Sequence, residues 1–404
     1  MTDSKQQPSL LFITTADPDS TPHAEWIPWT LEKAGWRVTT VTPAGNGSLL
    51  RQVLGARWNS RALPFGRGRN RLAAEYALLR ELLRARFGSD QVIYLHSQGL
   101  GWRAALVFLG PLFGKRLVYH NPDYFDPVTY PIRTTLEGIL ARRCDLVINH
   151  EFHRGYIMRA EYRLRCPVLV APPHLPIGWP VPPRSEQRRS EMAGGREDAF
   201  ILRLHSGFHP RRMVPQILEA LAILPERFRL AMTGRADGSA DPAAERLMTK
   251  LGISGRVVTL PRLGYGAMLE YTASSDAGIL LYANNDLGNF FQAPGRLTEY
   301  LACGLPVIAS RFTGIENLVL RYGIGCCAES GDPARLADAI LQLESQVRSG
   351  RFSPTLMRHR FETHFAYDHW ESRILGAFER ALRFGRGPSQ APPPEYWFPQ
   401  PIPE

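Results

Sequence analysis

The chain carries short runs of consecutive apolar residues, each bounded by residues that favour turns. Stretches with apolar residues at helical spacing separate these runs. Strands buried on both faces read as continuous apolar runs, and they alternate with helices when the sheet is parallel. In the first half of the chain the expected strands cover residues 9–15, 36–43, 91–98, 116–121, 145–150 and 167–173. The pattern therefore predicts a first domain built from repeated strand–helix units.

A segment rich in proline, glycine and charged residues, 172–198, interrupts this pattern. The alternation then restarts, with expected strands at 199–207, 228–234, 256–261, 277–282 and 306–310. We therefore expect an α/β fold of two Rossmann-like, doubly wound domains. The predicted divisions are an N-terminal domain (1–178), a linker (179–197), a C-terminal domain (198–365), a helix that is a candidate to cross back to the first domain (366–385) and a proline-rich tail (386–404).

Composition narrows the class of protein further. With 44% hydrophobic and 21% charged residues, a chain of 404 residues can bury proper cores. Its five cysteines are odd in number and scattered, which fits a reducing compartment better than a disulfide framework. The beginning of the chain lacks the features of a signal peptide. The longest apolar run, 104–114, is too short to span a bilayer. We expect a cytoplasmic protein.

The charge distribution suggests a partner for the first domain. The formal net charge is +10, and residues 51–90 hold nine arginines against three acidic residues. Such a patch attracts nucleic acid or an anionic membrane surface, and an ordinary solvated arginine-rich face is the alternative. Aromatic residues that would stack on bases are not interleaved with these arginines. We therefore expect no nucleic acid, and we consider adsorption to the inner membrane face.

One stretch of the second half, "PGRLTEYLACGLPVIAS" at 294–310, suggests a binding site. Pro294 suits the first turn of a helix, and Gly304 is well placed to end it. Arg296 and Glu299 lie off the apolar face of this helix. Free N–H groups and Arg296 could hold an anion, while the Glu299 carboxylate could accept hydrogen bonds from a sugar diol. A surface ion pair between Arg296 and Glu299 is the alternative.

Other motifs lie before and after this stretch, in a fixed order along the chain. They are "HSGFHPRRMVPQILEAL", "TGIE" and "ESGDPARLADAI", and together they cover roughly 200–340. This region resembles the C-terminal donor-binding domain of GT-B glycosyltransferases, specifically the retaining family 4 (glycosyl transferases group 1). The resemblance implies a GT-B fold, in which two Rossmann-like domains face each other across a cleft. It also implies transfer of a hexose from a nucleotide diphosphate sugar, UDP favoured and GDP next, to a glycan or polyprenyl-linked acceptor in bacterial cell-surface polysaccharide or glycolipid synthesis.

The resemblance also assigns roles to individual residues. Glu299 matches the glutamate that binds the nucleotide ribose, and Arg212 stands at the phosphate-binding lysine of the family. The other implied donor-binding residues are Gly207, Arg211, Gly234, Pro294 and Arg296. Cations at these positions make sense because the leaving nucleotide diphosphate gains negative charge. We expect retention of anomeric configuration, no cofactor and no metal.

Two departures from the family pattern leave the donor sugar open. Phe291 stands where the family often has a second glutamate near the transferred sugar, and Phe208 replaces an arginine. Two alternatives therefore stay open. One is a non-catalytic GT-B-like partner subunit of a glycan-assembly complex, and the other is a nucleotide-sugar epimerase or hydrolase.

The first domain offers further candidates. His120, at a strand end, and Asp123 just beyond it are the candidate catalytic residues, because a family histidine in a comparable loop lies near the anomeric carbon. A histidine that merely caps the loop is the alternative. The polar loop with Asp17, Asp19, Ser20 and Thr21 is a candidate for contacts with donor or acceptor hydroxyls, or an ordinary polar turn. His150 and His153 lack the His-Glu-x-x-His spacing and an evident third ligand, so they predict no metal site.

Overall fold

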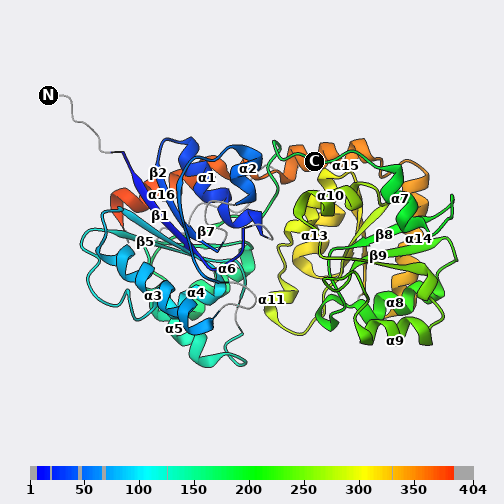
Figure 1. The fold of residues 1–404 in the computed structure, drawn as a ribbon, viewed down its shortest axis with the longest axis horizontal. Coiled ribbons are helices and arrows are strands. Elements are labelled where there is room, and N and C mark those ends of the chain that lie inside the picture. The colour runs from blue at the N-terminus through cyan, green and yellow to red at the C-terminus, as the bar shows by residue number, and fades with distance from the viewer. Residues whose placement is uncertain are drawn as a thin grey trace. The chain divides into compact units, whose positions relative to one another are not determined.

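The computed structural model describes residues 7–18, 21–43, 48–65, 70–124, 126–329 and 331–385. The chain forms two compact units (Figure 1). The first runs to Pro173 and takes up the chain again from Tyr367, and the second comprises His174–Ala366. Among the described residues, no helix has the length and apolar character needed to cross a membrane. All five cysteines are buried, and no disulfide joins any two of them.

The first unit is a doubly wound parallel sheet. Its seven strands lie in the order β3-β2-β1-β4-β5-β6-β7, and each pairs in parallel with its neighbours. The strands are β1 (Ser9–Thr14), β2 (Arg37–Thr42), β3 (Asn59–Ala62), β4 (Val92–His96), β5 (Arg116–Asn121), β6 (Leu146–Asn149) and β7 (Val168–Val170). The helices are η1 (Pro22–Glu25), α1 (Trp26–Lys33), α2 (Leu49–Leu54), α3 (Arg71–Phe87), α4 (Gln98–Ala104), α5 (Pro131–Ala141), α6 (Phe152–Glu161), η6 (Tyr367–Trp370) and α16 (Glu371–Phe384).

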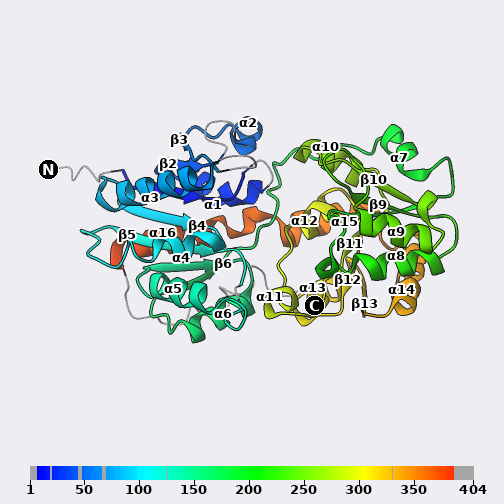
Figure 2. The same cartoon turned by 60° about the horizontal axis from the view of Figure 1, so that its bottom comes forward.

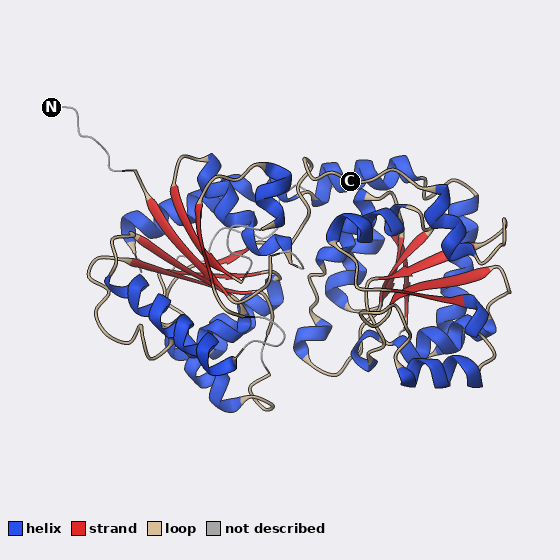
Figure 3. Cartoon of the chain, in the orientation of Figure 1, coloured by secondary structure: helices blue, strands red, loops and turns tan. Residues whose placement is uncertain are grey.

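The second unit repeats this architecture with six parallel strands in the order β10-β9-β8-β11-β12-β13. In each unit helices cover both faces of the sheet (Figure 3). The strands are β8 (Phe200–Leu204), β9 (Phe228–Thr233), β10 (Val257–Leu260), β11 (Ala277–Leu280), β12 (Val307–Ser310) and β13 (Gly325–Ala328). The helices are α7 (Glu186–Ala193), η3 (Pro210–Arg212), α8 (Val214–Ile223), α9 (Pro242–Lys250), η4 (Ser254–Arg256), α10 (Tyr265–Ala273), α11 (Leu287–Phe290), α12 (Gly295–Ala302), α13 (Thr313–Arg321), α14 (Pro333–Arg348), α15 (Pro354–Arg360) and η5 (Phe361–Phe365).

The segment that the composition marks as a linker is part of the second unit. Residues 179–197 contain α7, whose Met192 is fully buried in a small core cluster on the sheet. Arg189 of α7 forms an ion pair with Asp276 at 3.0 Å. Two buried apolar side chains at the end of this charged helix hold it against the core of the second unit. The surrounding prolines and charged residues dominate the composition, which is why the segment resembles a linker.

The last helix, α16, packs against the first unit. Its Phe378 ring lies 5.5 Å from the ring of Tyr94 on β4 and 6.2 Å from that of Trp36. Figure 2 shows α16 alongside the strands of the first sheet. Just before the helix, the hydroxyl of Tyr367 lies 2.8 Å from that of Thr30 on α1. The first unit is thus completed by the end of the described chain.

Each sheet has one position where the strand order reverses. It lies between β1 and β4 in the first unit and between β8 and β11 in the second. Helices leave the sheet in opposite directions there, which opens a crevice beyond the carboxyl ends of the strands, and open α/β sheets bind their ligands in it. A ligand site is therefore expected among the residues that follow β1, β4, β8 and β11.

Close packing on β11 gives a test of the second unit. A Cβ atom added to Gly278 would lie 2.3 Å from the ring of Tyr300, which is itself fully buried. We expect Gly278→Ala to lower the free energy of unfolding by about 2 kcal/mol because overpacking forces the ring aside. Gly266→Ala is the control, since that glycine is exposed and a Cβ there meets nothing within 4 Å. Thermal unfolding measures both, and equal melting temperatures would contradict the packing.

Candidate donor site

The stretch 294–310 forms a helix, a turn and a buried strand in the second unit. Pro294 is the N-cap of α12 rather than its first helical residue, so the helix begins at Gly295. The helix ends before Gly304, whose φ of 84° lies in the left-handed region that favours glycine. The apolar face of α12 is fully buried, and Glu299 lies on another face with 14% of its side chain exposed. The sequence pattern predicted this arrangement.

The Glu299 carboxylate is held by two partners from other elements. The His205 Nδ1 atom lies 3.0 Å from one carboxylate oxygen, and the Tyr265 hydroxyl donates to the other at 2.7 Å. His205 directly follows β8, and Tyr265 begins α10. The His205 Nε2 atom lies 2.7 Å from the hydroxyl oxygen of Thr272. These contacts fix the orientation of Glu299 beside the point where the strand order reverses.

Burial and charge set the protonation states of this group. Burial opposes ionisation of Glu299, but the hydrogen bonds from His205 and Tyr265 and the nearby charge of Arg296 outweigh it and hold its pKa below the usual value. Burial lowers the pKa of His205 to about 4, and the charges of Arg203 and Arg296 act in the same direction. At neutral pH, Glu299 is therefore a carboxylate and His205 a neutral imidazole that donates Nδ1–H. The remaining lone pairs of the carboxylate can accept hydrogen bonds from a ligand.

The two arginines expected at the donor phosphates lie in η3, between β8 and α8. The Arg212 guanidinium stacks over the Tyr282 ring at 4.4 Å, which fixes the cation in the loop after β11. Arg211 forms an ion pair with Asp286, and Asp286 also caps the N-terminus of α11. Both cations therefore lie beyond the carboxyl ends of the strands of this sheet.

The two glycines among the expected donor-binding residues pack closely against the backbone. A Cβ at Gly207 would lie 3.2 Å from the Thr233 carbonyl oxygen, and one at Gly234 would lie 2.6 Å from the Ser239 carbonyl oxygen. The structure thus gives both glycines a packing role. Phe291, at the position of the usual second glutamate, is the C-cap residue that follows α11, and its ring lies 4.9 Å from that of Phe290.

The candidates in the first unit fall into separate groups. His120, on β5, is buried, and its Nδ1 atom lies 2.7 Å from the Tyr94 hydroxyl. Asp123 is 61% exposed at its side chain, and its carboxylate lies 3.5 Å from the Arg154 guanidinium. Thr21 donates its hydroxyl to the Asp17 carbonyl oxygen at 2.6 Å. Two further candidates, Asp19 and Ser20, lie outside the described residues.

Sequence reasoning missed His205, Tyr265 and Thr272. His205 could have been found from the sequence, because it directly follows the first strand of the second unit. Polar residues after that strand lie at the crevice of a doubly wound sheet. Tyr265 and Thr272 are on α10, where helical periodicity alone does not separate a site residue from a packing residue.

Known proteins resemble this chain most clearly in the second unit, which holds the site described above. Residues 200–346 match the family described as Glycosyl transferases group 1. A curated relative, a D-inositol 3-phosphate glycosyltransferase of Acidothermus cellulolyticus, is 27% identical over 189 residues, which are 45% of this chain and 40% of the relative. The chain spans between 39% and 49% of the length of the first three curated relatives that it matches.

Solved structures share the fold over nearly the whole chain. A sucrose-phosphate synthase of Thermosynechococcus elongatus has a TM-score of 0.70 at 17% identity and covers 93% of this chain and 99% of its own. The Anabaena protein HepE, solved in complex with UDP and glucose, has a TM-score of 0.67 at 18% identity, with coverage of 92% and 100%. The chain therefore has the GT-B fold, as predicted. The match of residues 200–346 to the glycosyl transferases group 1 family confirms the resemblance found in the sequence.

The neutral state of His205 predicts a pH dependence of stability. An unfolded histidine binds a proton near pH 6.5, whereas folded His205 does so near pH 4. Stability therefore falls as the pH drops through this window, because only the unfolded state gains the proton. We expect wild type to lose about 2 kcal/mol more than His205→Asn between pH 7 and pH 5.

Urea unfolding at the two pH values measures this difference. Asparagine keeps a donor near the position of Nδ1 and does not titrate, so the variant isolates protonation from the loss of the hydrogen bond. His209→Asn, at an exposed position, is the control and should follow wild type. If the free energies of unfolding of wild type and His205→Asn fell equally between the two pH values, the buried imidazole would not be neutral.

Proposed function

We propose that this protein is a glycosyltransferase that moves a hexose from a nucleotide diphosphate sugar to a glycan or polyprenyl-linked acceptor, in bacterial cell-surface polysaccharide or glycolipid synthesis. UDP-sugars are the favoured donors and GDP-sugars come next. The observation that carries the proposal is the oriented, ionised Glu299 one turn into α12, inside the region of the family match. The HepE structure with UDP and glucose, which shares the fold, supports a UDP donor.

The residues around Glu299 suit the chemistry of a departing nucleotide diphosphate. Glu299 can accept hydrogen bonds from the ribose diol, which fixes the nucleoside. The diphosphate gains charge as the glycosidic bond breaks, and Arg212, Arg296 and free N–H groups at the start of α12 can stabilise that charge. Catalysis then rests on position and electrostatics, with the transition state stabilised more than the ground state. His120 and Asp123 of the first unit are the proposed residues at the reacting sugar, and the resemblance to the retaining family supports retention.

Nucleotide binding tests the donor site directly. A ligand at 100 times its dissociation constant adds about 2.7 kcal/mol, which corresponds to roughly 5–10 °C for a unit of this size. We expect one of UDP, GDP, ADP and TDP to raise the melting temperature of wild type by such an amount. Glu299→Ala should abolish the shift, because the ribose loses its acceptor.

Glu245→Ala is the matched control, since this exposed glutamate lies on α9 of the same unit. It should respond to the nucleotide as wild type does. If no nucleotide shifts wild type, the donor-binding hypothesis fails and the non-catalytic partner subunit becomes the better account. A shift that survives Glu299→Ala would place the nucleotide elsewhere.

We also propose that the first unit adsorbs to an anionic membrane surface, where a polyprenyl-linked acceptor would be found. Helix α3 presents an exposed apolar stripe at helical spacing, opposite its buried face. The stripe consists of Leu72, Tyr76, Leu79, Leu83 and Phe87, which are 41–81% exposed. The Phe87 ring lies 6.1 Å from that of Phe113, which extends the apolar surface. Apolar surface of this extent commonly marks an interaction site.

Charges beside the stripe favour a membrane over a neutral protein partner. Arg80 and Arg84 lie on the same helix and keep 55% and 53% of their side chains exposed, although both contact Glu81. Exposed apolar side chains flanked by cations suit the interface of an anionic bilayer, with the apolar groups among the acyl chains. Each cation near the surface contributes about 1 kcal/mol.

Flotation with vesicles tests this adsorption. We expect wild type to bind vesicles that contain phosphatidylglycerol more strongly than phosphatidylcholine vesicles, and less strongly at high salt. Replacing Leu72 and Leu79 by glutamate should weaken binding about tenfold or more, because two apolar contacts are lost. The control is Ile223→Glu, an apolar position on α8 of the other unit whose 58% exposure lies between those of Leu72 and Leu79. If the double variant bound the vesicles as wild type does, α3 would not be the surface that adsorbs to the membrane.

A further inference from the structure

Three histidines meet inside the first unit, at the carboxyl ends of three neighbouring strands. His96 ends β4, His120 lies on β5 and His150 directly follows β6. The register of the sheet places His96 beside His120. Each of the three has a ring nitrogen within 4.8 Å of the ring nitrogens of the other two. All three are at least 95% buried, with 2%, 3% and 5% of their surface exposed.

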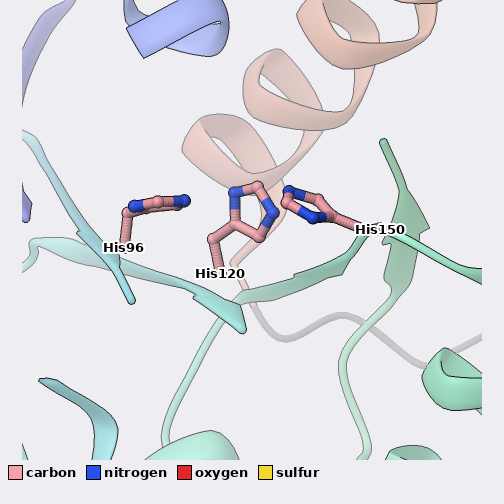
Figure 4. A group of neighbouring side chains, drawn as sticks. All are labelled: His96, His120 and His150. Carbon is pink, nitrogen blue, oxygen red and sulfur yellow. The ribbon is translucent and has the colours of Figure 1, made fainter. Parts of the chain in front are cut away.

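The rings converge rather than merely pack. Figure 4 shows the His120 ring between the other two, with a nitrogen of His96 and a nitrogen of His150 turned toward it. The centroid of the His120 ring lies 4.7 Å from each of the others, and both contacts are edge-to-face. A core that needed only packing would fill this space with apolar rings. Three imidazoles with nitrogens facing one another form a set of ligand atoms.

Hydrogen bonds on the outer side of the cluster leave its inner nitrogens available. The Nδ1 atom of His96 lies 3.0 Å from the Thr14 hydroxyl oxygen, and the Nδ1 atom of His120 lies 2.7 Å from the Tyr94 hydroxyl oxygen. The Nε2 atoms of His96 and His120 are buried and have no hydrogen-bond partner among the described residues. Histidines that bind metals use one nitrogen for the ion and the other for such an orienting contact.

We propose that His96, His120 and His150 bind a zinc ion, held by three imidazole nitrogens with a fourth position open. Three histidines and an open position are the ligand set of catalytic zinc sites. Zinc–nitrogen bonds of about 2.0–2.1 Å in a tetrahedral site place the nitrogens roughly 3.4 Å apart. Small rotations of the rings therefore close the site from the separations present here. The all-nitrogen ligand set disfavours calcium and magnesium, which take oxygen ligands.

The charges around the cluster set the strength of the site. Histidine binds metal in its neutral form, and burial of all three side chains opposes a proton charge on them. The guanidinium of Arg154 opposes a cation near His150, and Asp123, 3.5 Å from Arg154, offsets part of that charge. His23 adds a fourth imidazole, 5.6 Å from the His150 ring.

This inference goes beyond the proposed function and does not depend on it. The donor site lies in the second unit, whereas all three ligands belong to the first. A bound ion would occupy a nitrogen of His120, which we also place near the reacting sugar. An open coordination position beside that residue suits a sugar or acceptor oxygen.

Cobalt titration of the apoprotein, produced without a histidine tag and stripped with a chelator, tests the site. We expect one equivalent of Co²⁺ to bind with visible absorption of a four-coordinate complex, and Zn²⁺ to displace it. His96→Gln and His150→Gln should each weaken binding roughly 100-fold or more. His153→Gln is the matched control, because this histidine is 40% exposed at its side chain and pairs with Glu151 outside the cluster. It should bind as wild type does.

X-ray absorption at the zinc edge of wild type gives a second readout that needs no variant. Scattering from three imidazoles is the expected result. Sulfur scattering, which would place the metal on cysteines, would overturn the proposal. So would the absence of cobalt binding to wild type, or binding that the cluster variants leave unchanged while their thermal unfolding shows a folded chain. Loss of nucleotide binding in the Glu299 experiment would leave this result unaffected.

Discussion

A parallel sheet brings the carboxyl ends of all its strands to one edge, and the proposed chemistry of this chain depends on that constraint. Buried apolar strands can carry polar residues without cost only where they end, because the strand interiors are covered on both faces. The first unit places its histidines there, and the second places His205 and the arginines of η3 there. The reversal of strand order in each sheet then opens a crevice at the same edge.

Glu299 shows how the fold prepares a charged group for a ligand. A buried carboxylate normally resists ionisation, and here two hydrogen-bond donors from separate elements keep it charged. Its neighbours are fixed in turn, since the Tyr265 ring packs edge-on against that of Trp179 at 5.4 Å. Because the orientation is set before a ligand arrives, little ordering cost remains for binding. The same logic holds for Arg212, whose cation is stacked on Tyr282.

Much of the fold and part of the site could be predicted from the sequence. The continuous apolar runs predicted the strands, and the motifs around Glu299 predicted the donor region. Both predictions were possible because each feature depends on residues that are close together in the sequence. Residues 179–197 were misinterpreted as a linker, since the docking of α7 depends on Met192 and not on its average composition. The histidine cluster was missed because a metal motif was sought within one segment, at His150 and His153. Its members are far apart in sequence, and only the strand order makes them neighbours.

Transfer of a labelled sugar from a nucleotide donor to an acceptor tests whether this protein is a glycosyltransferase. The wild-type chain would be incubated with a panel of radiolabelled UDP- and GDP-sugars and a bacterial lipid extract, and the label followed by chromatography. We expect one donor to lose its label to an acceptor in proportion to the nucleotide diphosphate released, and Glu299→Ala to stop both. Release of nucleotide without labelled acceptor, or conversion of the donor to an isomer, would indicate a hydrolase or an epimerase. If every donor stayed intact although nucleotide bound, the chain would not be a transferase.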